Sequence, residues 1–326
     1  MKVRVVPFQP HCFHFGGFDI QMYRVNELLR SQGIDAEPLN YWSKDGDFDV
    51  LHFWGLEPSH LITMRYAKAY GKKITLSAIL PYITFNTQIR RIGSYLLGRR
   101  RHVQEILSYV DKLFVHNDLQ VEAAIKMYDV EPEKIEIVPS ILDPFFFSSQ
   151  DLQPFDGLRG YILCVGNISP RKNQLLLAQA AIIANSPIVF IGNILGGEES
   201  YTRRFQELIN ANPLFRWYKW ISFDEIRSVY VNSIGIALPS YDECQPGSAF
   251  EGAAIGKPLL LANRPYAHQK YFSGAKLVEP NSISSIANGL SEIMNNPRYF
   301  VPSREIMAEC HPDQIAKRLK DIFSKL

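Results

Sequence analysis

Residues 160–193 read GYILCVGNISPRKNQLLLAQAAIIANSPIVFIGN. The stretch begins and ends with short apolar runs that have the length of buried strands, and the segment between them has the length and composition of a helix. Two strands joined through a helix predict a βαβ unit with parallel strands. The stretch therefore indicates an α/β fold, and the rest of the chain repeats its pattern.

The same alternation lies on both sides of a linker. Residues 143–159 interrupt it with prolines, serines and glycine, as a linker does. We predict two Rossmann-like, doubly wound domains at 1–152 and 153–305, with a terminal helix at 306–326. Ligands of such sheets bind beyond the carboxyl ends of the strands, and the cleft between two such domains is the expected site. Strand patterns lie at 2–8, 47–55, 72–80, 112–117, 134–140, 160–167, 187–193, 215–221, 234–240, 257–263 and 275–280, and helical patterns at 19–33, 61–71, 89–109, 119–130, 174–185, 199–212, 222–233, 282–295 and 312–326.

Local patterns make three further predictions. In the helix at 19–33, Ile20, Tyr23 and Leu28 are expected on one apolar face. Ser222, followed three residues later by Glu225, has the spacing of a helix-capping box. The three phenylalanines at 145–147 are expected to pin the linker to a domain surface.

The composition is that of a globular protein. Hydrophobic residues make 46% of the 326 residues and charged residues 21%, and a net charge of +2 gives no basis for nucleic-acid binding. The four cysteines are scattered, which favours a reducing compartment. The sequence contains no signal-peptide pattern and no apolar run near ~20 residues, so a cytoplasmic protein without a transmembrane helix is expected.

Residues 240–258 read SYDECQPGSAFEGAAIGKP and follow a predicted strand at its carboxyl end. Glu243 and Glu251 stand with seven residues between them. Ser248 and Glu251 also fit a capping box, in which Glu251 only folds back on the helix start. The alternative is a nucleotide site: Gly247 admits close approach to the backbone, free amides at the helix start favour a phosphate, and a carboxylate one turn later suits a diol.

Four segments together resemble one family. Residues 239–259, 165–175 (VGNISPRKNQL), 13–33 with its Gly-Gly pair, and 130–147 (VEPEKIEIVPSILDPFFF) are similar to retaining glycosyltransferases of the two-Rossmann-domain (GT-B) type, family 4, the glycosyl transferases group 1. That family usually has PS..E.FGLP.LEA.A.G.PV where this chain has PSYDECQPGSAFEGAAIGKPL. The FGLP segment is therefore altered, Asn167 replaces a frequent arginine, and the histidine common after the third strand is missing.

The resemblance implies a role for each matching position. Lys172, with Arg171 beside it, would face the donor diphosphate, Glu243 the donor sugar, and Glu251 the ribose. The resemblance also implies that the terminal helix returns to the first domain. The further ligand-binding positions are Gly166 and Asn167, Gly247 and Ser248, and, towards the diphosphate and acceptor, Gly16 and Gly17.

The segment DGDFDVLHF contains a D-x-D pattern, which binds metal in the other glycosyltransferase fold. Here Asp45, Asp47 and Asp49 precede their strand, at the end away from the expected site. A lysine and a helix dipole can neutralise a diphosphate. We therefore predict that no divalent ion or other cofactor is required. The sequence leaves open whether a ligand contacts one of the histidines, His11, His14 or His52, and it favours a structural role for His116.

The expected activity is transfer of a hexosyl-like sugar, with retention, from a UDP- or GDP-sugar to a glycan, lipid-linked or other acceptor, as in polysaccharide biosynthesis. The alternatives are a nucleotide-sugar epimerase of the same architecture and a non-catalytic glycan- or lipid-binding relative. A basic helix is either simply solvated or contacts anionic lipid head groups at the inner face of the membrane, which would make the protein peripheral. Its arginines are Arg90, Arg91, Arg99, Arg100 and Arg101.

Overall fold

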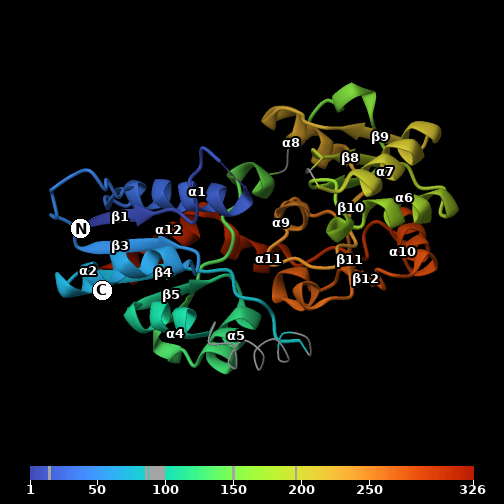
Figure 1. The fold of residues 1–326 in the computed structure, drawn as a ribbon. Coiled ribbons are helices and arrows are strands. Elements are labelled where there is room, and N and C mark those ends of the chain that lie inside the picture. Colours follow the sequence, from blue (N-terminus) through green and yellow to red (C-terminus); the bar gives the residue numbers. More distant parts are fainter. Residues whose placement is uncertain (14–15, 85–86, 88–99, 149–150, 195–196) are drawn as a thin grey trace. The chain divides into compact units, whose positions relative to one another are not determined.

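The computed structural model describes the chain except residues 14–15, 85–86, 88–99, 149–150 and 195–196. The described residues form two compact units, Met1–Ile141 with Glu309–Leu326, and Leu142–Ala308. Each unit contains a parallel sheet of six strands, which confirms the predicted α/β fold with two doubly wound sheets (Figure 1).

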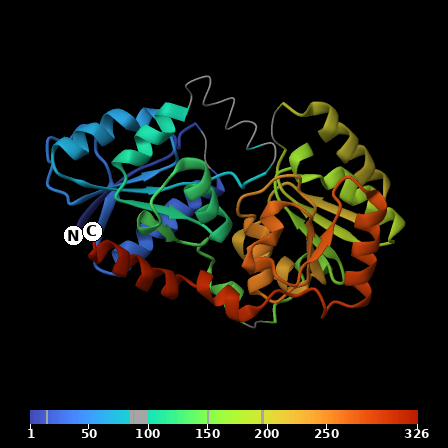
Figure 2. The ribbon, with the colours of Figure 1, turned by 90° about the horizontal axis from the view of Figure 1, so that it is seen from below.

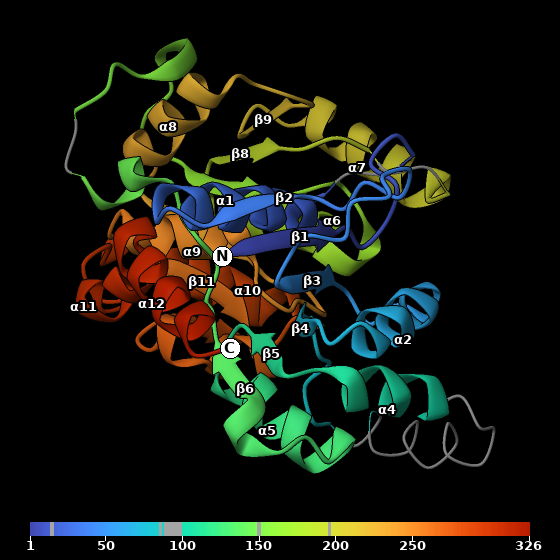
Figure 3. The same ribbon diagram turned by 90° about the vertical axis from the view of Figure 1, so that its left-hand side faces the viewer.

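The sheet of the first unit has the strand order β2-β1-β3-β4-β5-β6. Strand β3 reads VLHFW and is buried along its whole length, as expected of a parallel strand covered on both faces. Helices α2 and α4 lie side by side (Figure 3). The strands are β1 (Lys2–Val6), β2 (Asp35–Pro38), β3 (Val50–Trp54), β4 (Lys73–Ser77), β5 (Lys112–Val115) and β6 (Ile135–Ile137), and the helices are α1 (Gly17–Ser31), α2 (Leu61–Ala69), α4 (Arg100–Tyr109), α5 (Asp118–Tyr128) and α12 (Pro312–Ser324), with 3-10 turns η1 (Pro58–His60) and η2 (Pro132–Lys134).

The C-terminal helix α12 packs in the first unit, although the whole second unit precedes it in sequence. Figure 2 shows this red helix beside the blue elements of the N-terminal part of the chain. Leu319 and Phe323 are fully buried there, in one apolar cluster with Leu29 of α1. Each fully buried side chain of this size stabilises a fold by about 1.5–3 kcal/mol, so α12 is an integral part of this unit.

The apolar face of α1 differs from the one predicted. Ile20 and Tyr23 are 42% and 47% exposed. Met22, Val25 and Leu29 are buried instead, in the cluster that also contains residues of α12. The expectation for Ile20 and Tyr23 was therefore wrong, because the side of α1 that is covered is set by its packing partners.

The sheet of the second unit has the strand order β12-β11-β10-β7-β8-β9. The strands are β7 (Ile162–Val165), β8 (Ile188–Ile191), β9 (Phe215–Tyr218), β10 (Gly235–Leu238), β11 (Leu259–Ala262) and β12 (Lys276–Val278), and the helices are α6 (Gln174–Ile183), α7 (Glu199–Ala211), α8 (Phe223–Asn232), α9 (Gly247–Ala254), α10 (Ile283–Asn295) and α11 (Arg304–Met307), with 3-10 turns η3 (Pro144–Phe147), η4 (Phe155–Gly157), η5 (Pro170–Lys172), η6 (Pro265–His268) and η7 (Lys270–Phe272); η8 (Ala308–Cys310) follows α11. The predicted capping box at the start of α8 is confirmed, with Ser222 and Glu225 bonded to each other's main-chain N–H groups.

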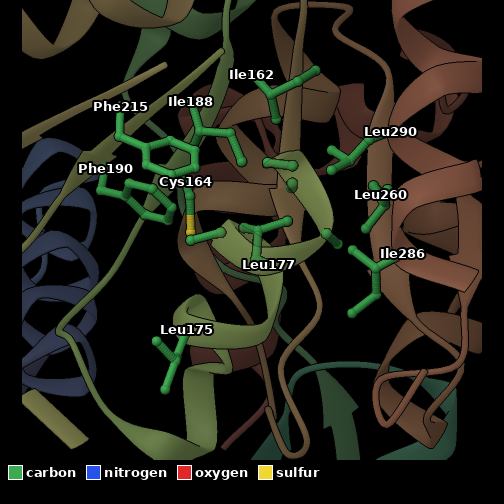
Figure 4. Packing of buried hydrophobic residues seen from close by; sticks show 14 of the residues in the cluster. Ile162, Cys164, Leu175, Leu177, Ile188, Phe190, Phe215, Leu260, Ile286 and Leu290 are labelled. Atoms are coloured by element: carbon green, nitrogen blue, oxygen red, sulfur yellow. The ribbon is translucent and has the colours of Figure 1, made fainter. Parts of the chain in front are cut away.

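The core of the second unit lies between its sheet and helices α6 and α10. Leu177 of α6 and Leu290 of α10 are fully buried in one cluster with Phe190 of β8 (Figure 4). Cys164 of β7 lies in the same cluster and is 2% exposed. The strand β7 is therefore fixed on a packed core, and the loop that follows it starts from a rigid position.

The start of the second unit is anchored as the sequence predicted for its phenylalanines. Phe145 and Phe146 are buried. The guanidinium of Arg227 in α8 lies 4.9 Å from the Phe145 ring centroid and pairs with Asp143 at 3.3 Å. Residues 143–147 are thus held against α8.

Candidate active site

The strand order of the second unit reverses between β7 and β10. From β7 the chain proceeds to β8 and β9 on one side, and it returns to β10 on the other side of β7. Ligands of doubly wound sheets bind at such a point, beyond the carboxyl ends of the strands. The loops after β7 and β10 contain Lys172 and Glu243, so the two residues predicted from separate motifs follow neighbouring strands.

Glu243 is a buried carboxylate held between two cations. Its Oε1 lies 2.5 Å from Lys172 Nζ and its Oε2 lies 3.1 Å from a guanidinium nitrogen of Arg171. Only 7% of the Glu243 side chain and 13% of the Lys172 side chain are exposed, against 52% for Arg171. The three groups together carry a formal charge of +1, and an ammonium has three N–H donors, so the cluster is suited to an anion.

The two loops are tied together by main-chain contacts. Arg171 donates to the carbonyl of Asp242 at 2.6 Å, and its own carbonyl accepts from the amide of Tyr241 at 2.9 Å. Asn173, in the left-handed region at φ 62°, donates from Nδ2 to the carbonyls of Pro239 at 3.1 Å and Pro280 at 2.8 Å. The position of Lys172 is therefore fixed from both sides. The sequence interpretation did not include Asn173.

Gly166 lies directly beneath the lysine stem. A Cβ at Gly166 would come within 3.4 Å of Lys172 Cε, and the φ of 153° is one that residues with a side chain rarely adopt. Asn167, the next residue, is exposed. The backbone conformation is what favours glycine at this position, because a contact of 3.4 Å would be an ordinary one.

Helix α9 begins at Gly247, with Pro246 as its N-cap and, in this described segment, no capping hydrogen bond from a side chain. The capping-box alternative for Ser248 is therefore not how this helix starts. Gly247 is exposed, and a Cβ added there would meet nothing within 4 Å. Glu251, one turn further, accepts a hydrogen bond from the hydroxyl of Tyr230 at 2.5 Å.

The two cysteines of this region are poor nucleophiles. Burial raises the pKa of Cys164 to about 12. Burial, with Asp242 and Glu243 nearby, raises the pKa of Cys244 to about 12 as well. Because the thiolate is the reactive form, neither thiol is suited to covalent catalysis at neutral pH.

In the first unit, the strand order reverses between β1 and β3. Gly16 and Gly17 lie after β1 at the start of α1, as their motif predicted. The amide of Gly16 donates to the buried carboxylate of Asp19 at 2.8 Å, and His11 Nε2 lies 3.2 Å from the other oxygen of Asp19. Asp19 therefore fixes this loop, which the sequence interpretation did not anticipate.

Two other histidines are structural. His52 is fully buried, with Nδ1 2.7 Å from the hydroxyl of Thr75, and burial lowers its pKa to about 3. His116 is buried with Nδ1 3.0 Å from the carbonyl of Val138, and burial lowers its pKa too. His14 lies outside the described residues.

Asp49 directly precedes β3, and its carboxylate accepts from the amide of Lys2 at 2.7 Å, while Asp47 pairs with the Lys2 ammonium. The aspartates therefore lie at the amino ends of β1 and β3 and hold them together there. In the described ranges, no three His, Cys, Asp or Glu side chains are grouped as metal ligands would be.

Of the basic helix predicted at 89–109, the structure describes the part that forms α4 (Arg100–Tyr109). Arg90, Arg91 and Arg99 lie outside the described residues, whereas Arg100 begins α4 and Arg101 is exposed on it. Among the helices that the structure describes, none is long and apolar enough to span a membrane.

Two parallel, doubly wound sheets of six strands, one in each unit, form the GT-B architecture. Residues 150–312 match the family model "Glycosyl transferases group 1", and the chain belongs to that family. Among curated proteins, it is 24% identical to a D-inositol 3-phosphate glycosyltransferase of Nocardioides sp. over 49% of this chain and 40% of that protein. It is 22% identical to the O-antigen chain mannosyltransferase RfbU of Salmonella typhimurium over 54% and 49% of the two chains. The chain thus spans about half the length of the curated relatives it matches.

Solved structures share the whole fold at low identity. A sucrose-phosphate synthase from Thermosynechococcus elongatus has a TM-score of 0.73 at 14% identity, covering 99% of this chain and 98% of that one. A trehalose-6-phosphate protein of E. coli, bound with UDP-2-fluoro glucose, has a TM-score of 0.71 at 10% identity, covering 100% and 99%.

Proposed function

We propose that the chain transfers a sugar, with retention of configuration, from a nucleoside-diphosphate sugar to a glycan, lipid-linked or other acceptor. The observation that carries the proposal is the arrangement of Lys172 and Arg171 on the buried carboxylate of Glu243, where the strand order reverses. Family membership supports it, and the related fold that binds UDP-2-fluoro glucose favours a UDP- or GDP-sugar as donor.

Each site residue has a chemical role in this proposal. The ammonium of Lys172 stabilises the diphosphate as the sugar bond breaks and negative charge develops, with Arg171 and the first amides of α9, at Gly247 and Ser248, in support. Glu243 both orients Lys172 and lies beside the donor sugar. Glu251 accepts hydrogen bonds from the ribose hydroxyls.

The remaining positions complete the donor and acceptor sites. Gly166 and Asn167 line the diphosphate side of the loop after β7. In the first unit, Gly16 and Gly17 are the proposed positions for contact with the acceptor and the diphosphate. No divalent ion and no further cofactor enters the proposed mechanism.

The proposed setting is the cytoplasm, with peripheral contact to the inner face of the membrane when the acceptor is lipid-linked. Its basis is the basic run from Arg90 to Arg101, which attracts anionic head groups. Sedimentation with vesicles that contain or lack anionic lipid tests this contact. Equal binding to both kinds of vesicle would remove the basic run from the proposal.

A ligand screen followed by product analysis tests the activity. UDP, GDP and ADP, and their hexose conjugates, are compared by thermal shift, since a ligand at 100 times its Kd stabilises by about 2.7 kcal/mol. The best donor is then incubated with acceptor candidates, and the anomeric configuration of the product is read by NMR. A chain that binds none of these nucleotides, or a product with inverted configuration, would overturn the proposal.

A further inference from the structure

We propose that Tyr230 is a positioning residue for the ribose-binding carboxylate of Glu251; the inference rests on the proposed function. Tyr230 belongs to α8, is fully buried, and donates its hydroxyl to Glu251 Oε2 at 2.5 Å. Its hydroxyl also lies 3.5 Å from the carbonyl of Ser248 in the first turn of α9. The phenol therefore meets α9 at the two positions assigned to donor binding.

The phenol itself is held in place from several directions. The ring of Phe146 packs edge-on against it, with 5.3 Å between ring centroids. The carbonyl of Tyr230 accepts from the hydroxyl of Ser233 at 2.9 Å. A side chain fixed by packing and by backbone bonds can in turn fix the group that it contacts, which a mobile surface residue cannot do.

Lys257 joins the ends of the same two helices. It follows α9, and its ammonium donates to the carbonyls of Val231 and Ser233, at 2.7 Å each, where α8 ends. Helices α8 and α9 are thus joined at their ends by Lys257 and along their length by the bond between Tyr230 and Glu251. The register of the two helices, and with it the place of Glu251, depends on both contacts.

Tyr230 remains a donor at any pH at which the protein functions. Burial and the nearby carboxylate of Glu251 raise its pKa well above the ordinary value of a phenol. A phenol can donate one hydrogen bond, and an ionised carboxylate can accept about four. The bond therefore orients Glu251 and uses one of the roughly four acceptor positions of its carboxylate.

Tyr161 supplies a matched control. It is also a buried tyrosine of this unit, and its hydroxyl donates to α8 as well, to the carbonyl of Val229 at 2.7 Å. Tyr161→Phe removes a buried hydroxyl that donates to α8, and Tyr230→Phe removes a buried hydroxyl that belongs to α8. A merely structural role for Tyr230 predicts the same consequences for both substitutions.

The experiment is calorimetric titration with the best-binding of UDP, GDP and ADP and with its 2′,3′-dideoxy counterpart. We expect Tyr230→Phe to weaken binding of the ribonucleotide roughly ten-fold and of the dideoxynucleotide less than about two-fold, because only the former uses the oriented carboxylate. Tyr161→Phe should lower the Tm and leave both affinities unchanged.

A double variant adds an independent readout. If Tyr230 acts through Glu251, then Tyr230→Phe combined with Glu251→Gln should bind no more weakly than Glu251→Gln alone. Additive losses, or an equal loss for both nucleotides in Tyr230→Phe, would overturn the inference. The inference would also fail if the Tyr230→Phe variant preferred the ribonucleotide over the dideoxynucleotide by the same factor as the wild type. A wild-type chain that binds no nucleoside diphosphate would instead refute the proposed function itself.

Discussion

Lys172→Ala is expected to remove most of the turnover at saturating donor. The ammonium lies 2.5 Å from Glu243 Oε1, and 13% of the side chain is exposed, so the charge is fixed and weakly screened. A diphosphate gains negative charge as the sugar bond breaks, and such a fixed group therefore stabilises the transition state more than the bound substrate. Removing one preorganised electrostatic group typically costs ~10²–10³ in rate.

The same substitution has a limited cost in stability. It leaves Glu243 buried beside Arg171, whose guanidinium lies 3.1 Å from the other carboxylate oxygen. Breaking a fully buried ion pair costs about 3–5 kcal/mol, and the second cation makes that range an upper limit. A loss of about 3 kcal/mol would lower the Tm of a unit of this size by roughly 6–12 °C. Rates must therefore be measured well below the Tm of the variant.

Arg171→Ala is the matched comparison in the assay. Because 52% of the Arg171 side chain is exposed, solvent screens its charge, and we expect a loss below about ten-fold. Lys172→Arg should recover only part of the activity, since a planar fork does not replace a compact charge. The measurement is the initial rate of transfer, or of slow donor hydrolysis. Turnover of Lys172→Ala within about three-fold of wild type, or a larger loss in Arg171→Ala, would refute the reasoning.

Three further outcomes are expected. Glu251→Gln should raise the donor KM by roughly ten- to a hundred-fold, as for a lost hydrogen bond to a charged group, and leave the acceptor KM unchanged; a variant that only melts earlier would limit Glu251 to a structural role. Transfer should survive excess chelator, because Asp47 and Asp49 bind Lys2 at the amino ends of β1 and β3; loss of activity with rescue by Mn²⁺ or Mg²⁺ would contradict this. The free energy of unfolding should fall as the pH drops from about 6.5 towards 3, because burial lowers the pKa of His52 to about 3 and only the unfolded chain then binds a proton at this histidine. His52→Gln should reduce this pH dependence, by at most about 5 kcal/mol over that range. Urea titrations at several pH values measure it, and an unchanged pH dependence in the variant would argue against the role of His52.

Most elements of both sheets could be predicted, because their strands are short apolar runs and their helices have an apolar face. Strand β2 was missed for the opposite reason. It reads DAEP, and Ala36 is its one buried residue. An edge strand this short and polar has no alternation to detect, and its place beside β1 follows from pairing, with Asp35 opposite Lys2.

The site residues could be found one motif at a time, but their pairing could not. Lys172 and Glu243 lie far apart in sequence, and they meet because β7 and β10 are neighbours in the sheet. The sequence pattern predicts that both strands belong to a parallel sheet without giving their order. Glu243 therefore contacts both Lys172 and Arg171 because of the strand order, which the sequence pattern does not give.

Tyr230 illustrates why a residue that orients a site is harder to recognise than one that forms it. In the pattern of α8 it is one more apolar position, and burial alone would assign it to the core. A buried phenol must still find a hydrogen-bond partner. Tyr161 and Tyr266 donate to main-chain carbonyls, of Val229 at 2.7 Å and Leu238 at 2.9 Å, whereas Tyr230 donates to a carboxylate. A carboxylate in contact with a buried phenol is held in one orientation, which suits a second partner that must meet it at a defined angle. The partner of the hydroxyl, which only the folded chain identifies, therefore separates the tyrosine with a proposed role in ligand binding from those that complete the core.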